Sequence, residues 1–139
     1  MSKQANIEAQ KRFGEAVQSG RFELLPELVS QSVVDHDPAP GQAPGPQGYA
    51  EFFQMLRTAF PDMKIEVDHL VADEDNVAFA YTLTGTHQGP FMGVQPTGRP
   101  VEVRGMQISR FDGGKMVERW GSSDELGILK QIGAAPALT

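Results

Sequence analysis

The hydrophobic period of this chain changes from helical to extended at Pro61. Before it, apolar residues recur every three or four positions over residues 6–19 and 47–60, which is the pattern of amphipathic helices. After it, apolar and polar residues alternate, as they do in strands with one buried face. Helices followed by strands predict an α+β fold, with the helices packed on one face of a curved antiparallel sheet.

The alternating half of the chain is predicted to form two hairpins and a closing helix. Residues 112–114, Asp-Gly-Gly, are typical of a tight turn between the last two strands. A short helix should run over residues 125–132 and end at Gly133. The predicted strands of the two hairpins cover residues 63–68, 77–87, 101–111 and 115–121.

The region between the two long helices is less regular. Residues 22–29 are predicted to form a short helix, and residues 32–36 a short strand. Residues 38–46 are rich in proline and glycine. We expect them to form a loop, and a loop of this length in a compact domain often rims a pocket.

A length of 139 residues supports one hydrophobic core, so we expect a single domain over residues 1–139 with flexible ends at 1–5 and 134–139. The net charge of -6 opposes phosphate neutralisation, and nucleic acid is therefore not an expected partner. No apolar run approaches the roughly 20 residues that span a bilayer, and the N-terminus lacks the apolar stretch of a signal peptide. These features predict a cytoplasmic protein without a membrane partner.

The chain contains no cysteine, which excludes disulfides and thiolate chemistry. Its three histidines lack a close metal-ligand spacing such as HExxH, so no metal site is expected. Any chemistry should come from carboxylates, imidazoles, arginines and hydroxyls.

Polar residues at inward-facing strand positions are the candidates for a functional site. Asp124 shares the alternation of Met116 and Trp120 on the last strand, although an aspartate just before a helix is equally a typical N-cap. His87 and His36 each share the parity of apolar neighbours. A lone histidine there is more often structural, but two histidines and an aspartate together favour a site.

The position of Arg104 depends on the register of the last hairpin. A two-residue turn at 113–114 places Gln107 opposite Trp120 and puts Arg104 on the other face. A three-residue loop with a bulge places Met106 opposite Trp120 and puts Arg104 on the same face. The sequence leaves both registers open, and a surface ion pair is as good an explanation of Arg104.

Several segments carry a resemblance to a known family. Residues 85–101 read GTHQGPFMGVQPTGRPV, which resembles the GTHxGxFxGxxPTGRxV signature of SnoaL-like polyketide cyclases and their ester-cyclase relatives. The likeness is strongest from residue 36 to residue 133. The further matching segments are residues 34–38, 59–62, 108–111, 114–120, 124 and 129–133.

The resemblance implies the cone-shaped α+β barrel of nuclear transport factor 2 and ketosteroid isomerase, which is a cystatin-like architecture. It also implies an enzyme that closes a ring in a polyketide ester by an intramolecular aldol reaction without cofactor. In that family a pocket aspartate near the end of the last strand is the acid/base, and Asp124 matches this position. Members commonly form homodimers through the sheet, so a homodimer with a small hydrophobic organic substrate is expected.

The expected pocket surrounds Asp124 with apolar walls and hydrogen-bond donors. His36, His87 or Arg104 would stabilise the enolate, and burial would raise the pKa of the aspartate. Two alternatives stay open: a non-catalytic binder of hydrophobic ligands, and an isomerase or hydrolase of the same fold. The predicted lining residues are Phe52, Phe53, Phe91, Met106 and Trp120.

Overall fold

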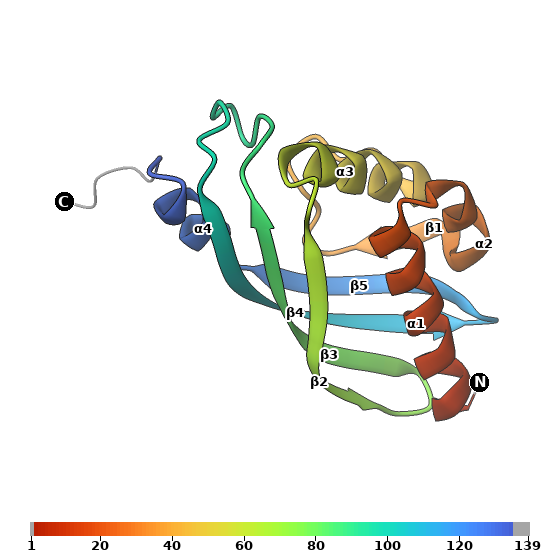
Figure 1. The fold of residues 1–139 in the computed structure, drawn as a ribbon. Helices are drawn as coiled ribbons and strands as arrows, with labels where there is room; N and C mark the ends of the chain where they lie inside the picture. Colours follow the sequence, from red (N-terminus) through yellow and green to blue (C-terminus); the bar gives the residue numbers. More distant parts are fainter. Residues whose placement is uncertain (1, 135–139) are drawn as a thin grey trace.

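The computed structural model describes residues 2–134, and Figure 1 shows its fold. Helices α1, η1, α2 and α3 come mostly before the sheet, and α4 follows it. The elements are α1 (Lys3–Ser19), the 3₁₀ turn η1 (Phe22–Leu24), α2 (Leu25–Leu28), β1 (Val29–Asp35), α3 (Gly45–Ala59), β2 (Lys64–Ala72), β3 (Asn76–Thr86), β4 (Pro100–Asp112), β5 (Lys115–Ser123) and α4 (Glu125–Gln131).

The strands form one sheet in the order β1-β5-β4-β3-β2. β1 pairs parallel to β5, and the other neighbours are antiparallel. In Figure 1 the sheet bends strongly along β2, β3 and β4, while α1 and α3 lie on its concave side. The predicted α+β fold, with helices on one face of a curved sheet, is confirmed.

Helix α1 is capped at both ends. The Ser2 hydroxyl accepts a hydrogen bond from the backbone N–H of Ala5 at 3.1 Å, and Gly20 ends the helix with a φ of 75°. Residues 3–5, predicted to belong to a flexible end, form the first turn of this helix. Residue 1 and residues 135–139 of the predicted flexible ends lie outside the described residues, whereas residue 134 lies within them.

The core fills the space between α1, α3 and the concave face of the sheet. Phe13 of α1 makes edge contacts with Tyr49 and Phe53 of α3, at ring-centroid distances of 6.2 and 6.1 Å. The apolar stripes predicted for the two long helices therefore pack against each other and against the strands.

The register of the last hairpin differs from both predicted registers. Asp112 pairs with Lys115 across the two-residue turn, but β5 then accommodates one extra residue, Val117, in a bulge. Ile108, instead of Gln107 or Met106, therefore lies opposite Trp120. The bulge reverses which side of β5 faces the core from this point onward.

This bulge overturns the predicted parity of the last strand. Met116 is buried, but the next inward positions on β5 are Arg119 and Gly121, not Glu118 and Trp120. Arg104 does share a face with Trp120, yet this face is the outer one. The expectation that Met106 and Trp120 face the interior is wrong, and Met106 is 65% exposed. For Arg104, whose face the sequence left open, the structure decides in favour of the outer face.

No helix in the part of the chain from residue 2 to residue 134 is long and apolar enough to cross a membrane.

Candidate functional site

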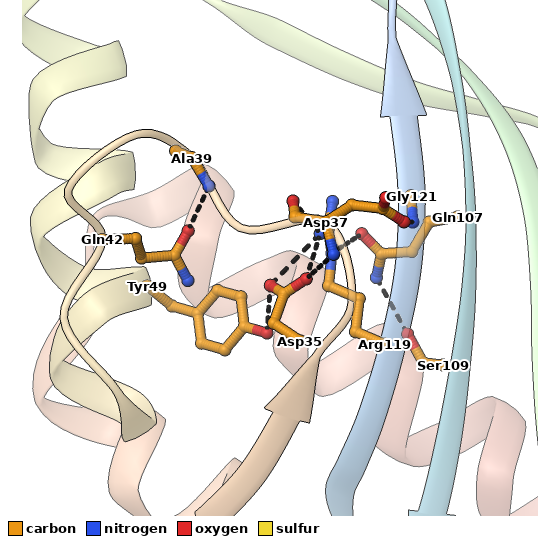
Figure 2. Close-up of polar contacts among 9 residues, drawn as sticks. All are labelled: Asp35, Asp37, Ala39, Gln42, Tyr49, Gln107, Ser109, Arg119 and Gly121. Atoms are coloured by element: carbon orange, nitrogen blue, oxygen red, sulfur yellow. Dashed lines mark hydrogen bonds and ion pairs between the residues drawn. The ribbon is translucent and has the colours of Figure 1, made fainter.

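A polar network lies on the concave face of the sheet, where β1 and β5 run side by side (Figure 2). Asp35 ends β1, and Arg119 lies opposite it on β5. Arg119 Nη1 is 3.0 Å from Asp35 Oδ1 and 3.2 Å from Asp35 Oδ2. The two side chains are 20% and 8% exposed, so this is a largely buried ion pair.

Tyr49 reaches the same carboxylate from α3. Its hydroxyl donates a hydrogen bond of 2.7 Å to Asp35 Oδ2, and the backbone N–H of Asp37 donates one of 2.9 Å to Asp35 Oδ1. Burial, followed by the hydrogen bond and charge of Asp35, raises the pKa of Tyr49 far above its ordinary value. Tyr49 is therefore a permanent donor, and Asp35 uses both oxygens within the network.

The remaining contacts orient the guanidinium of Arg119. Its Nε donates to Gln107 Oε1 at 2.9 Å, and Gln107 Nε2 in turn donates to the buried Ser109 hydroxyl at 2.9 Å. Nη2 of Arg119 has no acceptor among the described residues and is not fully buried. The network thus holds a charged donor in place and leaves one of its nitrogens available to a ligand.

Asp37 lies at the exposed rim of the network. Its Oδ2 accepts a hydrogen bond of 2.9 Å from the backbone N–H of Gly121, while its Oδ1 has no partner within residues 2–134. Figure 2 shows this carboxylate beside Arg119 and Gly121. A carboxylate with one free oxygen next to a guanidinium can accept a proton while the guanidinium stabilises negative charge.

The predicted site residues lie in three different places. Asp124 is the N-cap of α4: its Oδ1 accepts from the backbone N–H of Gly127 at 2.8 Å, and the residue is exposed. His36 stacks on Trp120 on the outer face, with ring centroids 4.7 Å apart. His87 is fully buried at the end of β3. The structure does not bring these three side chains together, and their catalytic roles stay predictions.

Each of the two histidines has a local structural explanation. His36 Nε2 lies 2.6 Å from Glu118 Oε2, and this contact, followed by Arg110, lowers the pKa of Glu118. His87 Nδ1 accepts a hydrogen bond of 3.2 Å from the backbone N–H of Thr97, which ties the base of the 88–99 loop together. The His87 Nε2 atom is buried without a partner among the described residues.

Arg104 and Asp124 do meet, but on the outside of the sheet. They line an outer cleft of about 510 Å³ together with Glu66 and Glu102. A second hollow of about 670 Å³ lies beside α3 and includes Phe22 and Met55. Neither hollow contains Asp35 or Arg119.

The predicted apolar lining divides between the two faces. Phe52 and Phe53 of α3 are half-buried and pack against the core, with their rings 5.2 Å apart. Phe91 is buried against Phe60 at 5.4 Å. Trp120 lies on the outer face with Met106, so only the phenylalanines occupy the predicted interior.

The sequence reasoning missed the four side chains that form the network. Tyr49 counted only as part of an apolar helical stripe, and Asp35 only as part of a short motif. Arg119 and Gln107 were hidden by the bulge, because strict alternation from Met116 assigns Arg119 to the solvent face. One feature of the sequence could have pointed to the network: Gln107 and Arg119, a neutral and a charged polar residue, lie on the last two predicted strands, where they can contact each other.

A family model described as SnoaL-like polyketide cyclase matches residues 7–132. No curated protein matches the chain. IdmH from Streptomyces antibioticus, a candidate polyketide cyclase, is 37% identical; the match covers 92% of this chain and 98% of IdmH, with a TM-score of 0.79.

Two further solved structures extend the comparison. AclR from Streptomyces galilaeus, a candidate hydroxylase, is 31% identical over 94% of this chain and 99% of AclR, with a TM-score of 0.75. TsrD from Streptomyces laurentii has a TM-score of 0.86 at 22% identity, covering 96% of this chain and 98% of TsrD, and shows likeness of fold alone.

Proposed function

The chain belongs to the SnoaL-like polyketide cyclase family, and on that premise we propose that it closes a ring in a polyketide ester or related carbon acid by cofactor-independent acid/base chemistry. We place the reaction at the network of Asp35, Arg119 and Tyr49, with Asp37 at its rim. The observation that carries the proposal is the Nη2 atom of Arg119. It is an oriented donor without an acceptor of its own among the described residues.

The proposed reaction is an intramolecular aldol closure. Asp37 Oδ1 takes the proton from a carbon between two carbonyls, and Arg119 donates hydrogen bonds to the enolate oxygen. The carbanion attacks a ketone carbon, a carbon–carbon bond forms, and the electron pair of the C=O bond moves onto its oxygen. Asp37 then returns the proton to this alkoxide, so the product is an isomer of the substrate.

Asp37 suits the role of base better than Asp35 does. Both oxygens of Asp35 accept hydrogen bonds from Tyr49, Arg119 or the Asp37 backbone, and its side chain is 8% exposed. Asp37 keeps one oxygen free at the solvent-facing rim. Asp35 is then a positioning residue that holds Arg119.

The experiment is an assay with aromatic polyketide methyl esters that carry an acidic carbon between two carbonyls. Chromatography with mass detection follows the isomeric product, and deuterium incorporation from D₂O follows proton removal by itself. We expect Asp37→Asn to lower kcat by at least about 10²-fold and Arg119→Met by about 10²- to 10³-fold. Thermal unfolding of each variant verifies that it is folded.

Asp124→Asn is the discriminating comparison, because asparagine caps a helix as well as aspartate does. We expect this variant to keep kcat within about twofold of the wild type. If Asp124→Asn abolishes turnover while Asp37→Asn keeps it, the acid/base is the residue at the start of α4 instead. Tight binding of the esters without turnover or deuterium exchange would identify a ligand-binding protein.

We also propose that the protein is a homodimer that pairs through the outer face of the sheet. Three apolar side chains on this face are strongly exposed: Val34 at 51%, Met106 at 65% and Ile108 at 43%. Burying them would remove apolar surface from water. Light scattering after size exclusion should give twice the chain mass for the wild type and a monomer for Met106→Glu; a monomeric wild type contradicts the proposal.

A further inference from the structure

We propose that Tyr81 is a second hydrogen-bond donor to the substrate, paired with Arg119 above a floor formed by Gly105 and Gly121. The inference rests on the proposed function and adds to it a second donor residue, which would hold the enolate of the proposed 1,3-dicarbonyl substrate. The pair would bind the two oxygens of that enolate, one donor to each.

The two glycines lie next to each other on the concave face. Tyr81 of β3 lies directly opposite Gly105 of β4, and Gly105 lies opposite Ser123 of β5. Gly121 precedes Ser123 by two residues, so it is the diagonal neighbour of Gly105 on the same face. Two adjacent inward positions of the sheet therefore carry no side chain.

Lack of room for a side chain, and not an unusual backbone conformation, explains why both positions are glycine. Neither has a positive φ. A Cβ atom on Gly105 would collide with the Tyr81 hydroxyl and the ring carbon that bears it, and a Cβ atom on Gly121 would collide with Arg119 Nη2. The polar ends of Tyr81 and Arg119 thus lie directly on the backbone, where side chains of residues 105 and 121 would otherwise be.

Both polar ends can donate to a ligand. Arg119 Nη2 has no acceptor among the described residues. The Tyr81 hydroxyl neighbours the Ser123 hydroxyl, which can donate to it and leave its own proton free. Burial raises the pKa of Tyr81, and this exceeds the lowering by Arg119 and Ser123, so the phenol stays protonated near neutral pH.

The spacing of the two donors fits a delocalised enolate. Diagonal neighbours on one face of a sheet lie about 7–8 Å apart, and each donor end rests close to its glycine. Hydrogen bonds of about 2.8 Å that rise from the two donors toward a ligand above the sheet can reach two oxygens joined by a three-carbon chain. An enolate between two carbonyls carries its charge on two such oxygens.

Packing by itself accounts for the ring of Tyr81 but not for its hydroxyl. The ring contacts Phe79 at a centroid distance of 5.9 Å, which a phenylalanine at position 81 would reproduce. The hydroxyl is the group that Gly105 makes room for. Removing only this oxygen is therefore the informative change.

The test uses quinizarin, a dihydroxyanthraquinone whose visible absorption changes when a hydroxyl beside a ring carbonyl ionises. Titration with the wild type over a range of pH should show tighter binding of the ionised dye than of the neutral dye. We expect Tyr81→Phe to weaken binding of the ionised dye about tenfold and to keep binding of the neutral dye within about twofold. Gly105→Ala, which displaces the phenol, should give the same result.

Ser122→Ala is the matched control, because Ser122 lies on the outer side of β5 next to Ser123. It should bind both forms of the dye as the wild type does. Circular dichroism verifies the fold of each variant, and Gly105→Ala carries the test if Tyr81→Phe does not fold. Wild-type binding of the ionised dye by folded Tyr81→Phe overturns the proposal.

Failure of this inference and failure of the proposed function give different results. If Tyr81→Phe binds the ionised dye normally but Arg119→Met does not, Tyr81 is no donor and the proposed reaction is untouched. If both variants lose the ionised dye but the wild type turns over no ester, the pair of donors is supported and the cyclase reaction is refuted.

Discussion

Replacing Tyr49 with phenylalanine removes one hydroxyl from the buried network. A hydrogen bond to a charged group contributes about 1.5–3 kcal/mol to stability. Asp35 keeps its contacts with Arg119 and with the Asp37 backbone, and the ring keeps its edge contact with Phe13 at 6.2 Å. We therefore expect a loss near the lower limit, about 1.5 kcal/mol, or about 5 °C in Tm for a chain of this length.

The same hydroxyl predicts how stability responds to alkaline pH. Burial and Asp35 raise the pKa of Tyr49 in the folded protein, so the folded state keeps the proton. Above a pH of about 10 the unfolded chain loses it, and stability falls with rising pH by up to about 1.4 kcal/mol per pH unit. Tyr49→Phe lacks this dependence, so its stability should approach that of the wild type above pH 10.

Urea unfolding at pH 7, 9, 10 and 11, followed by circular dichroism, measures both effects. Tyr81→Phe is the comparison at pH 7, because it removes the only other phenol in the chain and leaves Asp35 with all its donors. In alkali it also loses the contribution of Tyr81, whose pKa is raised by burial too. Equal stability of Tyr49→Phe and wild type at pH 7 would refute the structural role of this hydrogen bond. A constant difference up to pH 11 would refute the burial argument.

Three further changes test other parts of the structure. Asp124→Ala should lower the free energy of unfolding by about 1 kcal/mol because it removes the cap of α4, whereas Asp124→Asn should leave it almost unchanged. Thermal unfolding measures both variants, and equal losses contradict the capping role. Gly121→Ala should lower the free energy of unfolding by about 1–3 kcal/mol, because its Cβ displaces Arg119 Nη2. Urea unfolding measures this, and an unchanged midpoint would show that the guanidinium can move aside without cost. The side-chain and backbone hydrogen bonds of Thr86 lower the pKa of Asp62, so its contribution is present at neutral pH and lost as the pH falls below about 4. Asp62→Asn should thus be less stable than wild type at pH 7 and equal to it near pH 2; a difference that persists in acid refutes this.

Local patterns determined most of the fold. The apolar stripes of α1 and α3 and the alternation in β2 to β5 reflect which residues each element buries against its neighbours, and this information repeats every turn or every second residue. Gly113 and Gly114, both with positive φ, similarly encode a tight turn. The resemblance over residues 85–101 pointed to the family for the same reason, because it is a contiguous segment.

Only the tertiary structure determined which residues come together in the polar network. The bulge at Val117 depends on how β5 fits β4 and β1 together, and no nearby residue marks it, so Arg119 appeared to face solvent. The ion pair joins Asp35 to Arg119 across 84 positions of sequence, and Tyr49 reaches it from a third element. A single residue of slip exchanges the two faces of a strand, and only the packed sheet determines where that slip occurs.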